Sequence, residues 1–313
     1  MAGHSLLEII IFVAIVTACM WLDLHAHSKD KPVSARDAAL WTAAWVVLAF
    51  AFAAYIGWNE GADKAQLFIA GYLLEESLSV DNLFVMMAIF GSFAIRDKFQ
   101  HRVLYYGILG AVVMRLLFVA AGSSIIALFG PYALAGFGIF VLWTAWKMFR
   151  SMGHEQEEEI DYAHHWAVRW TQKIVPVHAQ LHGHDFFVLG EHKGKKTWKA
   201  TPLFLCLIVI EISDIMFAFD SVPAVIAITS DPFLVYTSNI FAILGLRSMF
   251  FLLSAAKRYL RHLEKAVIAI LAFIGAKMLL DVSGFIHVPA SVSLAVVALL
   301  LLTGILASLL PDK

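Results

Sequence analysis

The sequence has few of the residues on which soluble enzymes and secreted domains depend. It contains 2 cysteines in 313 residues, and only 15% of its residues are charged, whereas 61% are hydrophobic. Two isolated thiols, Cys19 and Cys206, imply neither a disulfide framework nor a zinc site. The sequence has no GxSxG, HExxH, P-loop or glycine-rich dinucleotide motif, so it does not predict an enzyme or an ATP-driven pump.

Long apolar blocks dominate instead. A helix needs about 20 apolar residues to cross a ~30 Å hydrocarbon layer. No Lys or Arg precedes the first block, and no small-residue cleavage site follows it, so it is not a signal peptide. We predict an all-α polytopic membrane protein with about nine transmembrane helices, near residues 5–24, 38–57, 65–93, 102–126, 131–149, 200–228, 233–256, 264–282 and 288–310.

The basic residues predict the orientation in the membrane. Lys and Arg gather in four connections, near 29–36, 96–102, 150–199 and 257–265, whereas the intervening loops hold only Lys64. Cytoplasmic loops carry an excess of Lys and Arg. The N-terminus is therefore expected outside the cytoplasm, and the C-terminus inside it. The net charge of −1 says nothing about partners. The lipid bilayer is the expected surrounding medium, and no nucleic-acid partner is expected.

Charged residues within the apolar blocks reveal an internal repeat. EESLSVDNLFVMMAI (75–89) aligns with DIMFAFDSVPAVIAI (214–228), and the acidic residues coincide. The next block of each half contains one arginine, Arg115 or Arg247, and the block after that a Lys-Met pair, in TAWKM and GAKM. Because each unit has three spans, the second enters the membrane in the opposite sense. We predict two inverted three-helix repeats, at 65–149 and 200–282.

The rest of the chain is organised around these repeats in a single membrane domain, 1–313. Residues 1–57 and 288–310 supply peripheral helices to which we assign no chemical role. A polar cytoplasmic loop, 151–198, joins the two repeats. Near its end, DFFVLGEHKGKKTWKATP alternates between apolar and polar residues and has a Gly-Lys turn, which predicts a short β-hairpin. Near its start, the acidic run EQEEEID predicts a solvated helix face.

Carboxylates within the apolar blocks are the candidate metal ligands. Each costs roughly 2.5–3.5 kcal/mol at the bilayer centre, so acids retained there are functional by default. Hydroxyl and amide groups close by in sequence make an all-oxygen environment, which suits hard divalent cations such as Mn²⁺, Mg²⁺ or Ca²⁺. The carboxylates are Glu75, Asp81, Glu211, Asp214 and Asp220, and the supporting groups are Ser77, Ser79, Asn82, Ser213 and Ser221.

The spacing of these acids favours a broken helix. Residues six apart on a regular helix point about 120° away from each other and lie ~9 Å apart along its axis. Pro223 has no N–H, so the carbonyl of Phe219 loses its helical partner and can face an ion. Met216, one turn before Asp220, can add a thioether, which favours transition metals over Mg²⁺ and Ca²⁺.

Basic residues in the same blocks are expected to balance the acids. Arg115 and Arg247 should hold the unliganded carboxylates charged and not bind the ion themselves. Asn239, two turns before Arg247, is expected to add a polar contact, and Lys277 fits either a partner of the acids or a structural role. Five acids against three bases leave two excess negative charges, which one divalent cation neutralises. Purely structural ion pairing is the alternative.

The motifs resemble those of a known family. ESLSVDN at 76–82, EISDIMFAFDSVPA at 211–224 and TSNIFAILGLRSMFFLL at 237–253 resemble the TerC family of integral membrane proteins, most closely its Alx-like branch. That family is associated with manganese export and tellurite resistance. The resemblance covers nearly the whole chain and implies Mn²⁺ as the ion, the five carboxylates as its site, and the bacterial inner membrane as the location.

The sequence therefore predicts a secondary transporter that exports Mn²⁺ from the cytoplasm through a midplane carboxylate site, without a permanently bound cofactor. Exchange for H⁺ is the simplest coupling scheme for a site with two excess negative charges. Two alternatives stay open. One is a non-transporting membrane scaffold that recruits protein partners through the 151–198 loop, and the other is a carrier of another cation, such as Ca²⁺ or Na⁺.

Overall fold

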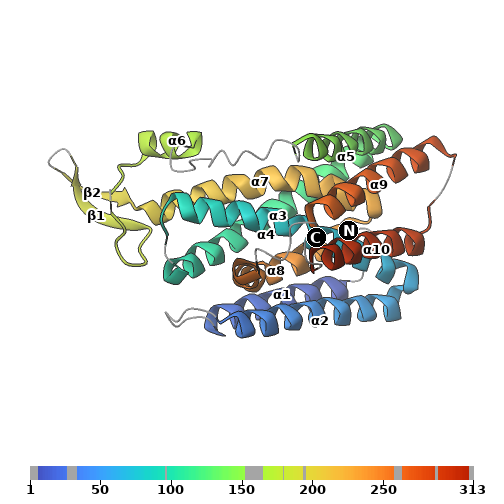
Figure 1. Cartoon of the computed structure of the whole chain (residues 1–313), viewed down its shortest axis with the longest axis horizontal. Helices are drawn as coiled ribbons and strands as arrows, with labels where there is room; N and C mark the ends of the chain where they lie inside the picture. Colours follow the sequence, from blue (N-terminus) through green and yellow to red (C-terminus); the bar gives the residue numbers. More distant parts are fainter. Residues whose placement is uncertain are drawn as a thin grey trace.

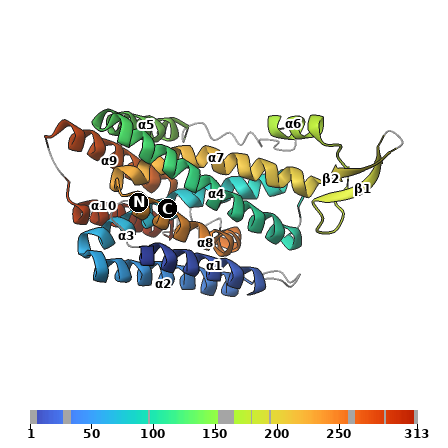
Figure 2. The same cartoon turned by 180° about the vertical axis from the view of Figure 1, so that it is seen from behind.

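The computed structural model of the chain describes residues 6–26, 34–95, 97–151, 165–178, 180–192, 195–256, 263–285 and 288–309. Most of its helices run lengthwise in an elongated bundle, from one end of which a small β-hairpin projects (Figures 1 and 2). In chain order the elements are α1 (Leu6–Ala26), α2 (Ala35–Glu60), α3 (Ala62–Ser92), α4 (Asp97–Phe129), α5 (Pro131–Ser151), α6 (Trp166–Ile174), β1 (Phe187–His192), β2 (Lys195–Ala200), α7 (Pro202–Ile228), α8 (Pro232–Ala256), α9 (Leu263–Ser283) and α10 (Ala290–Leu309).

The apolar blocks expected from the sequence coincide with helices. Among the described residues, seven helices are long and apolar enough to cross a membrane, namely α2, α4, α5, α7, α8, α9 and α10. The apolar part of α1, Glu8–Leu22, is shorter. In α3, the acidic residues Glu75, Glu76 and Asp81 interrupt the apolar run, and this helix packs against α2, α7, α8 and α10. The prediction of a helical membrane protein is confirmed, whereas the count of nine spans and the inverted repeats stay predictions.

Four helices, α3, α4, α7 and α8, pack against one another around the centre of the bundle. Both α3 and α4 pack against both α7 and α8, and most of α8 is buried within the protein. In both views α1 and α2 lie along one side of the bundle, and α5 lies along the opposite side (Figures 1 and 2). Side chains that point inward from α3, α4, α7 and α8 are therefore screened from lipid by the other helices.

Local chemistry sets several helix boundaries. The side chain of Ser34 accepts a hydrogen bond from the N–H of Asp37 at 3.1 Å and so caps α2. Between α4 and α5, Gly130 has a φ of +52°, a left-handed conformation that favours glycine. Pro131 follows at the first position of α5, where its missing N–H costs no helical hydrogen bond. These residues turn the chain back within one residue.

The expected break in α7 is wrong. The helix continues through Pro223 from Pro202 to Ile228, and α3 is likewise uninterrupted. Proline removes one backbone hydrogen bond, the one that would reach the carbonyl of Phe219. Its neighbours Val222 and Ala224 are buried, and their packing keeps the backbone helical. Acidic side chains therefore meet between helices and not along one broken helix.

α5 and α9 approach each other at a pair of glycines. A Cβ atom on Gly275 would lie 3.0 Å from the carbonyl oxygen of Gly138, and one on Gly138 would lie 3.3 Å from the carbonyl oxygen of Gly275. Small residues commonly allow such close backbone contact between membrane helices. Because α5 and α9 are the third helices of the two predicted repeats, this contact joins one half of the protein to the other.

The predicted β-hairpin is confirmed. Strands β1 and β2 pair in antiparallel fashion, with Phe187 opposite Ala200 and Leu189 opposite Trp198. The hairpin leads directly into α7, so it marks the end of the bundle at which α7 begins. The acidic run at 155–161, predicted as a solvated helix face, lies outside the described residues.

The short helix α6 packs onto α7 beside this end of the bundle. His165 caps it, because Nδ1 of its ring accepts a hydrogen bond from the N–H of Ala167 at 3.4 Å. Burial lowers the pKa of His165, which favours the neutral ring that can accept this bond.

Candidate cation site

Arg115 is the centre of a buried polar cluster where α3, α4, α7 and α8 meet. Its Nη1 forms an ion pair with Glu75 of α3. The same nitrogen donates hydrogen bonds at 2.6 Å to Oγ of Ser221 on α7 and at 2.6 Å to Oδ1 of Asn239 on α8. Its Nη2 lies 3.9 Å from Oδ1 of Asp214, also on α7. One guanidinium on α4 thus connects the other three interior helices, and we call these five residues the Arg115 cluster.

The Arg115 cluster is almost completely shielded from solvent and lipid, and none of its residues is more than 3% exposed. Glu75 and Asp214 against Arg115 leave one formal negative charge. Within the part of the chain that the structure describes, Oε2 of Glu75 and Oδ2 of Asp214 are buried and form no hydrogen bond of ordinary geometry, although the hydroxyl of Ser221 lies close to the Glu75 carboxylate. Buried polar atoms of native proteins nearly always have partners. Two open carboxylate oxygens therefore leave places for a cation or a proton.

The sequence alignment of the two halves had matched Glu75 with Asp214, and the structure brings both to the same guanidinium. The polar contact expected of Asn239 is present, and its partner is Arg115 of α4. Two turns on one helix, as from Asn239 to Arg247, separate residues by about 12 Å along the axis, more than these side chains can span. The neighbouring helix α4 is closer.

Arg247 and Asp214 line the same small cavity. Arg247 is 3% exposed, and the cavity is also lined by Ile210 of α7, Met86 of α3 and Gly107 of α4. Asp214 is thus common to the Arg115 cluster and to this cavity. The arrangement places an arginine from each half of the chain near one carboxylate.

Glu211 lies one turn before Asp214, but its carboxylate rests against α4. A Cβ atom on Gly110 would lie 2.1 Å from each carboxylate oxygen of Glu211. Any side chain at this position would displace the Glu211 carboxylate, which is the far end of a flexible side chain, so glycine is needed for the observed position of the carboxylate and not for the packing of the helices. Sequence reasoning missed Gly110, since a single glycine in an apolar helix is not by itself a signal.

The predicted serine ligands divide into two groups. Ser221 belongs to the Arg115 cluster. Ser77 donates to the carbonyl of Leu73 at 2.6 Å, and Ser213 to the carbonyl of Val209 at 2.8 Å, so both hydroxyl protons are used within their own helices. Ser79 and Asn82 of α3 are buried.

The predicted thioether ligand is wrong. Met216 is 61% exposed on α7 and therefore faces away from the interior. It follows Asp214 by two residues, which rotates it by about 200° around the helix. Phe219 is also exposed and packs edge-on against Phe118, with ring centroids 4.7 Å apart. Since α7 is not broken, its carbonyl does not turn towards an ion.

Lys277 lies apart from Glu75 and Asp214, the described carboxylates of the Arg115 cluster. It is buried on α9 and lines a cavity of about 350 Å³ together with Asp281, Thr229 and Ser230. This cavity lies at the end of α7, which is about 20 Å along the helix axis from Asp214. The positive charge of Lys277 therefore belongs to a different part of the protein.

Asp81 and Asp220 lie within α3 and α7, but their side chains are outside what the structure describes. In the described part of the chain, no group of three or more His, Cys, Asp or Glu residues is arranged to hold a metal ion. The Arg115 cluster contains two described carboxylates, those of Glu75 and Asp214, and both lie near the guanidinium of Arg115.

A second buried cluster was missed. Trp45, Tyr72 and Glu76 bury polar side-chain atoms in this second cluster, and the hydroxyl of Tyr72 lies within hydrogen-bonding reach of the Glu76 carboxylate. A Cβ atom on Gly245 of α8 would lie 3.7 Å from both Oε1 of Glu76 and Cβ of Trp45. Neighbours on a helix point about 100° apart, which directs Glu76 towards α2 and α8 while Glu75 faces Arg115.

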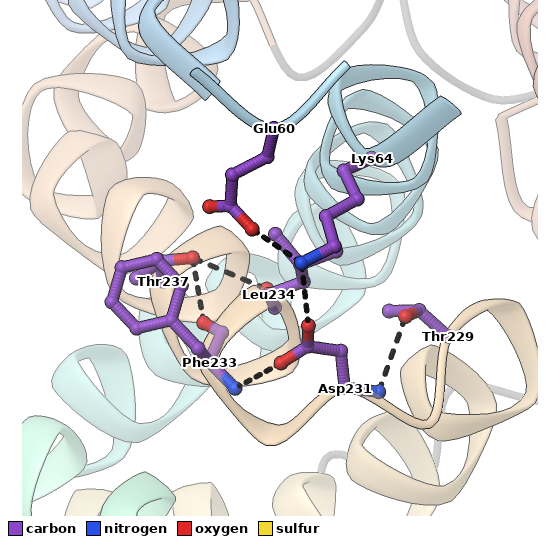
Figure 3. Close-up of polar contacts among 7 residues, drawn as sticks. All are labelled: Glu60, Lys64, Thr229, Asp231, Phe233, Leu234 and Thr237. Atoms are coloured by element: carbon purple, nitrogen blue, oxygen red, sulfur yellow. Dashed lines mark hydrogen bonds and ion pairs between the residues drawn. The ribbon is translucent and has the colours of Figure 1, made fainter. Parts of the chain in front are cut away.

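A separate polar network closes the end of the bundle opposite the hairpin (Figure 3). Lys64, in the first turn of α3, forms an ion pair with Glu60 of α2 and lies 3.7 Å from Oδ2 of Asp231. Oδ1 of Asp231 accepts a hydrogen bond from the N–H of Phe233 at 3.0 Å and so caps α8. The N–H of Asp231 donates to Oγ1 of Thr229 at 3.2 Å. This network ties the α2–α3 turn to the α7–α8 turn.

The chain is similar to known proteins along nearly its whole length. Residues 60–313 match the integral membrane protein TerC family. The "Tellurium resistance protein TerC" of Serratia marcescens is 47% identical over 99% of this chain and 96% of its own length. The "Putative membrane-bound redox modulator Alx" of Escherichia coli (strain K12) is 40% identical over 91% of this chain and 89% of its own length. The "Thylakoid membrane protein TERC, chloroplastic" of Arabidopsis thaliana is 44% identical over 83% and 65%, respectively. No solved structure matches the chain.

Proposed function

The chain belongs to the integral membrane protein TerC family, and from that premise we propose that it is a secondary transporter that exports Mn²⁺ from the cytoplasm. The observation that carries the proposal is the Arg115 cluster. Two buried carboxylates from different helices, Glu75 and Asp214, each keep one oxygen without a hydrogen-bond partner in the described part of the protein. Open, buried carboxylate oxygens attract a cation, and the low local dielectric strengthens that attraction.

Ligand chemistry indicates the class of cation, and the family resemblance indicates which cation it is. The carboxylates, with Ser221 and Asn239, supply oxygen ligands that suit a hard divalent cation. Because Met216 faces outward, the site has no thioether ligand that would favour Mn²⁺ over Mg²⁺ or Ca²⁺. Mn²⁺ therefore follows from the family resemblance, and a Ca²⁺ carrier is the nearest alternative. Tellurite is an oxyanion that this site would repel, so a tellurium-resistance function would be indirect.

Arg115 serves in this proposal as an internal counter-cation. In the empty site its guanidinium pairs with Glu75 and approaches Asp214, which lowers the cost of two buried charges. An arriving Mn²⁺ takes over both carboxylates. Arg115 keeps its hydrogen bonds to Ser221 and Asn239, so it moves aside without losing all of its partners. Exchange of one cation for another avoids an intermediate with bare buried carboxylates.

Alternating access follows from the predicted inverted repeats. The halves α3–α5 and α7–α9, within nine spans, rock against each other about the site, as in other transporters built from inverted repeats. The close backbone contact at Gly138 and Gly275 is the point about which α5 and α9 move against each other, with Leu142 and Leu279 packed beside it. On the return step, protons replace the metal on the carboxylates, which couples export of Mn²⁺ to entry of H⁺.

The test is Mn²⁺ flux in proteoliposomes that contain the purified protein. We expect flux with the wild type and none with Glu75→Gln or Asp214→Asn, once size-exclusion profiles show that both variants are folded. Asp63→Asn is the matched control, because it removes an exposed carboxylate from the same helix as Glu75. Wild-type protein without flux, beside an active reference transporter, would refute the proposal.

Coupling is tested in the same vesicles. Mn²⁺ efflux should accelerate when a pH gradient drives protons in the opposite direction. Flux that ignores both an imposed pH gradient and the membrane potential would contradict proton exchange while leaving Mn²⁺ transport intact. If the protein is instead a scaffold, deletion of the 151–198 loop should abolish recruitment of its protein partners, whereas Asp214→Asn should not.

A further inference from the structure

The short helix α6 has an exposed aromatic stripe that the proposed transport mechanism does not use. Trp166, Trp170 and Ile174 follow one another at intervals of four residues and are 56%, 63% and 70% exposed. Residues spaced in this way lie on one side of a helix. On the other side, Ala167 and Val168 are buried where α6 packs onto α7. The stripe therefore points away from the protein.

Basic side chains border the stripe. Arg169 and Lys173 are both exposed, and the helical repeat places them next to Trp166 and Trp170 on the outer surface. A helix with Trp and aliphatic residues on one strip and Lys or Arg beside it has the composition of helices that lie in a membrane interface. Anionic headgroups complement its charge.

The position of α6 fits that environment. In both views α6 lies on the flank of the bundle, along the same side as α5, whereas the hairpin projects from the end (Figures 1 and 2). The flank of a membrane bundle is the surface that meets lipid. An exposed stripe on the flank, at the level where α7 begins, faces the boundary between headgroups and acyl chains.

The same residue types recur on α5. Trp143 and Trp146 are exposed near the end of α5, and Lys147 and Arg150 lie over their rings at 5.6 and 5.4 Å. Trp and basic residues at the ends of membrane helices anchor them at the interface. The flank of the protein thus presents aromatic and basic residues on two successive elements, α5 and α6.

We infer that α6 is an interfacial helix, whose Trp166–Trp170–Ile174 stripe inserts into the membrane leaflet at the hairpin end and whose Arg169 and Lys173 bind anionic phospholipid headgroups. By the positive-inside pattern this is the cytoplasmic leaflet. The inference is independent of the transported ion. In this arrangement part of the 151–198 loop binds lipid and not a soluble protein. The interfacial position of α6 also anchors the first turns of α7, the helix that carries Asp214.

The test measures the surroundings of α6 in the full-length protein. Trp170→Cys is labelled with a bimane dye in a Cys19→Ser background, because Cys206 is completely buried and should not react. The protein that carries Cys19→Ser alone is treated with the same dye, and its fluorescence gives the background signal without an introduced cysteine. The matched control is Trp198→Cys on the hairpin, which is 61% exposed and therefore as accessible as Trp170. Both proteins are placed in phosphatidylcholine nanodiscs with or without phosphatidylglycerol.

We expect lipids that carry a doxyl group near the headgroup to quench the dye at position 170 and not at 198, and aqueous iodide to do the reverse. Phosphatidylglycerol should increase lipid quenching at 170. Arg169→Gln with Lys173→Gln should abolish that increase, and high salt should weaken it. Ile174→Cys provides a second labelling position if Trp170→Cys does not fold.

Iodide quenching at 170 and 174 as strong as at 198, with no lipid quenching, would overturn the inference and leave the stripe free for a soluble protein. Lipid quenching that is the same with and without phosphatidylglycerol would overturn the assignment of Arg169 and Lys173 to anionic headgroups.

Discussion

Oδ1 of Asn239 accepts a hydrogen bond at 2.6 Å from Nη1 of Arg115, so a neutral amide on α8 holds the guanidinium of α4. The amide nitrogen of Asn239 in turn donates to the carbonyl of Val235 at 2.9 Å, which fixes its orientation. This contact crosses from one predicted repeat to the other. It leaves the carboxylates of Glu75 and Asp214 to be shared between Arg115 and an incoming cation.

Removal of the central charge should be strongly destabilising. Arg115→Gln removes the guanidinium that pairs with Glu75 and approaches Asp214, and breaking a buried pair in this way costs about 3–5 kcal/mol. Thermal unfolding in detergent should show the loss. Arg150→Gln, which removes an exposed arginine, is the control. The double variant Glu75→Gln with Arg115→Gln should recover part of the stability, and a double variant no more stable than Arg115→Gln would contradict the pairing.

Loss of the amide should weaken the cluster by less. Asn239→Leu keeps the approximate volume but removes a hydrogen bond to a charged group, worth about 1.5–3 kcal/mol. Transport of Mn²⁺ should fall as well, because Arg115 loses a partner on which it relies when the carboxylates bind metal. Ser124→Ala, an exposed hydroxyl bonded within α4, should change neither quantity. Equal effects of the two substitutions would argue against a special role for Asn239.

The contact of Glu211 with Gly110 should be sensitive to one methyl group. Gly110→Ala places a Cβ atom where the Glu211 carboxylate lies, so both stability and transport should decrease. Gly136→Ala has open space around its Cβ atom and should be neutral or stabilising, by roughly 0.5–1 kcal/mol. If the clash is the cause, Glu211→Ala in the Gly110→Ala background restores stability. A Gly110→Ala protein as stable and active as wild type would exclude this packing.

The network at the opposite end of the bundle should contribute modestly. Asp231→Ala removes the cap of α8 and the contact with Lys64, and loss of a cap costs about 0.5–2 kcal/mol. The melting temperature should fall accordingly, while Asp63→Ala on the adjoining turn should leave it nearly unchanged. Mn²⁺ binding should survive in both variants. A loss of binding in Asp231→Ala would connect this network to the ion path.

Mn²⁺ itself should stabilise the folded protein. A ligand that binds only the native state adds about 2.7 kcal/mol at a concentration 100 times its Kd. The midpoint of thermal unfolding should therefore rise on addition of Mn²⁺ and return when EDTA removes it. Glu75→Gln should abolish the rise and Asp63→Asn should preserve it. A rise of the same size in Glu75→Gln would place the metal elsewhere.

Local patterns in the amino-acid sequence determined much of this architecture. Apolar blocks of membrane length coincide with helices, because a segment of that composition can satisfy its backbone in a bilayer only as a helix. Alternation and a Gly-Lys turn were sufficient to predict the hairpin. Glu75 and Asp214 were matched by their positions in the repeat, and both lie at Arg115.

Only the tertiary structure decided which side chains meet. Met216 is close to Asp214 in sequence but faces outward, and Glu76 follows Glu75 but faces a different helix. Asn239 shares a helix with Arg247 and yet binds Arg115. Sequence periodicity gives the angle between side chains on one helix, but the neighbour that each face meets depends on how separate helices cross. Close approaches such as that of Gly138 to Gly275 settle those crossings.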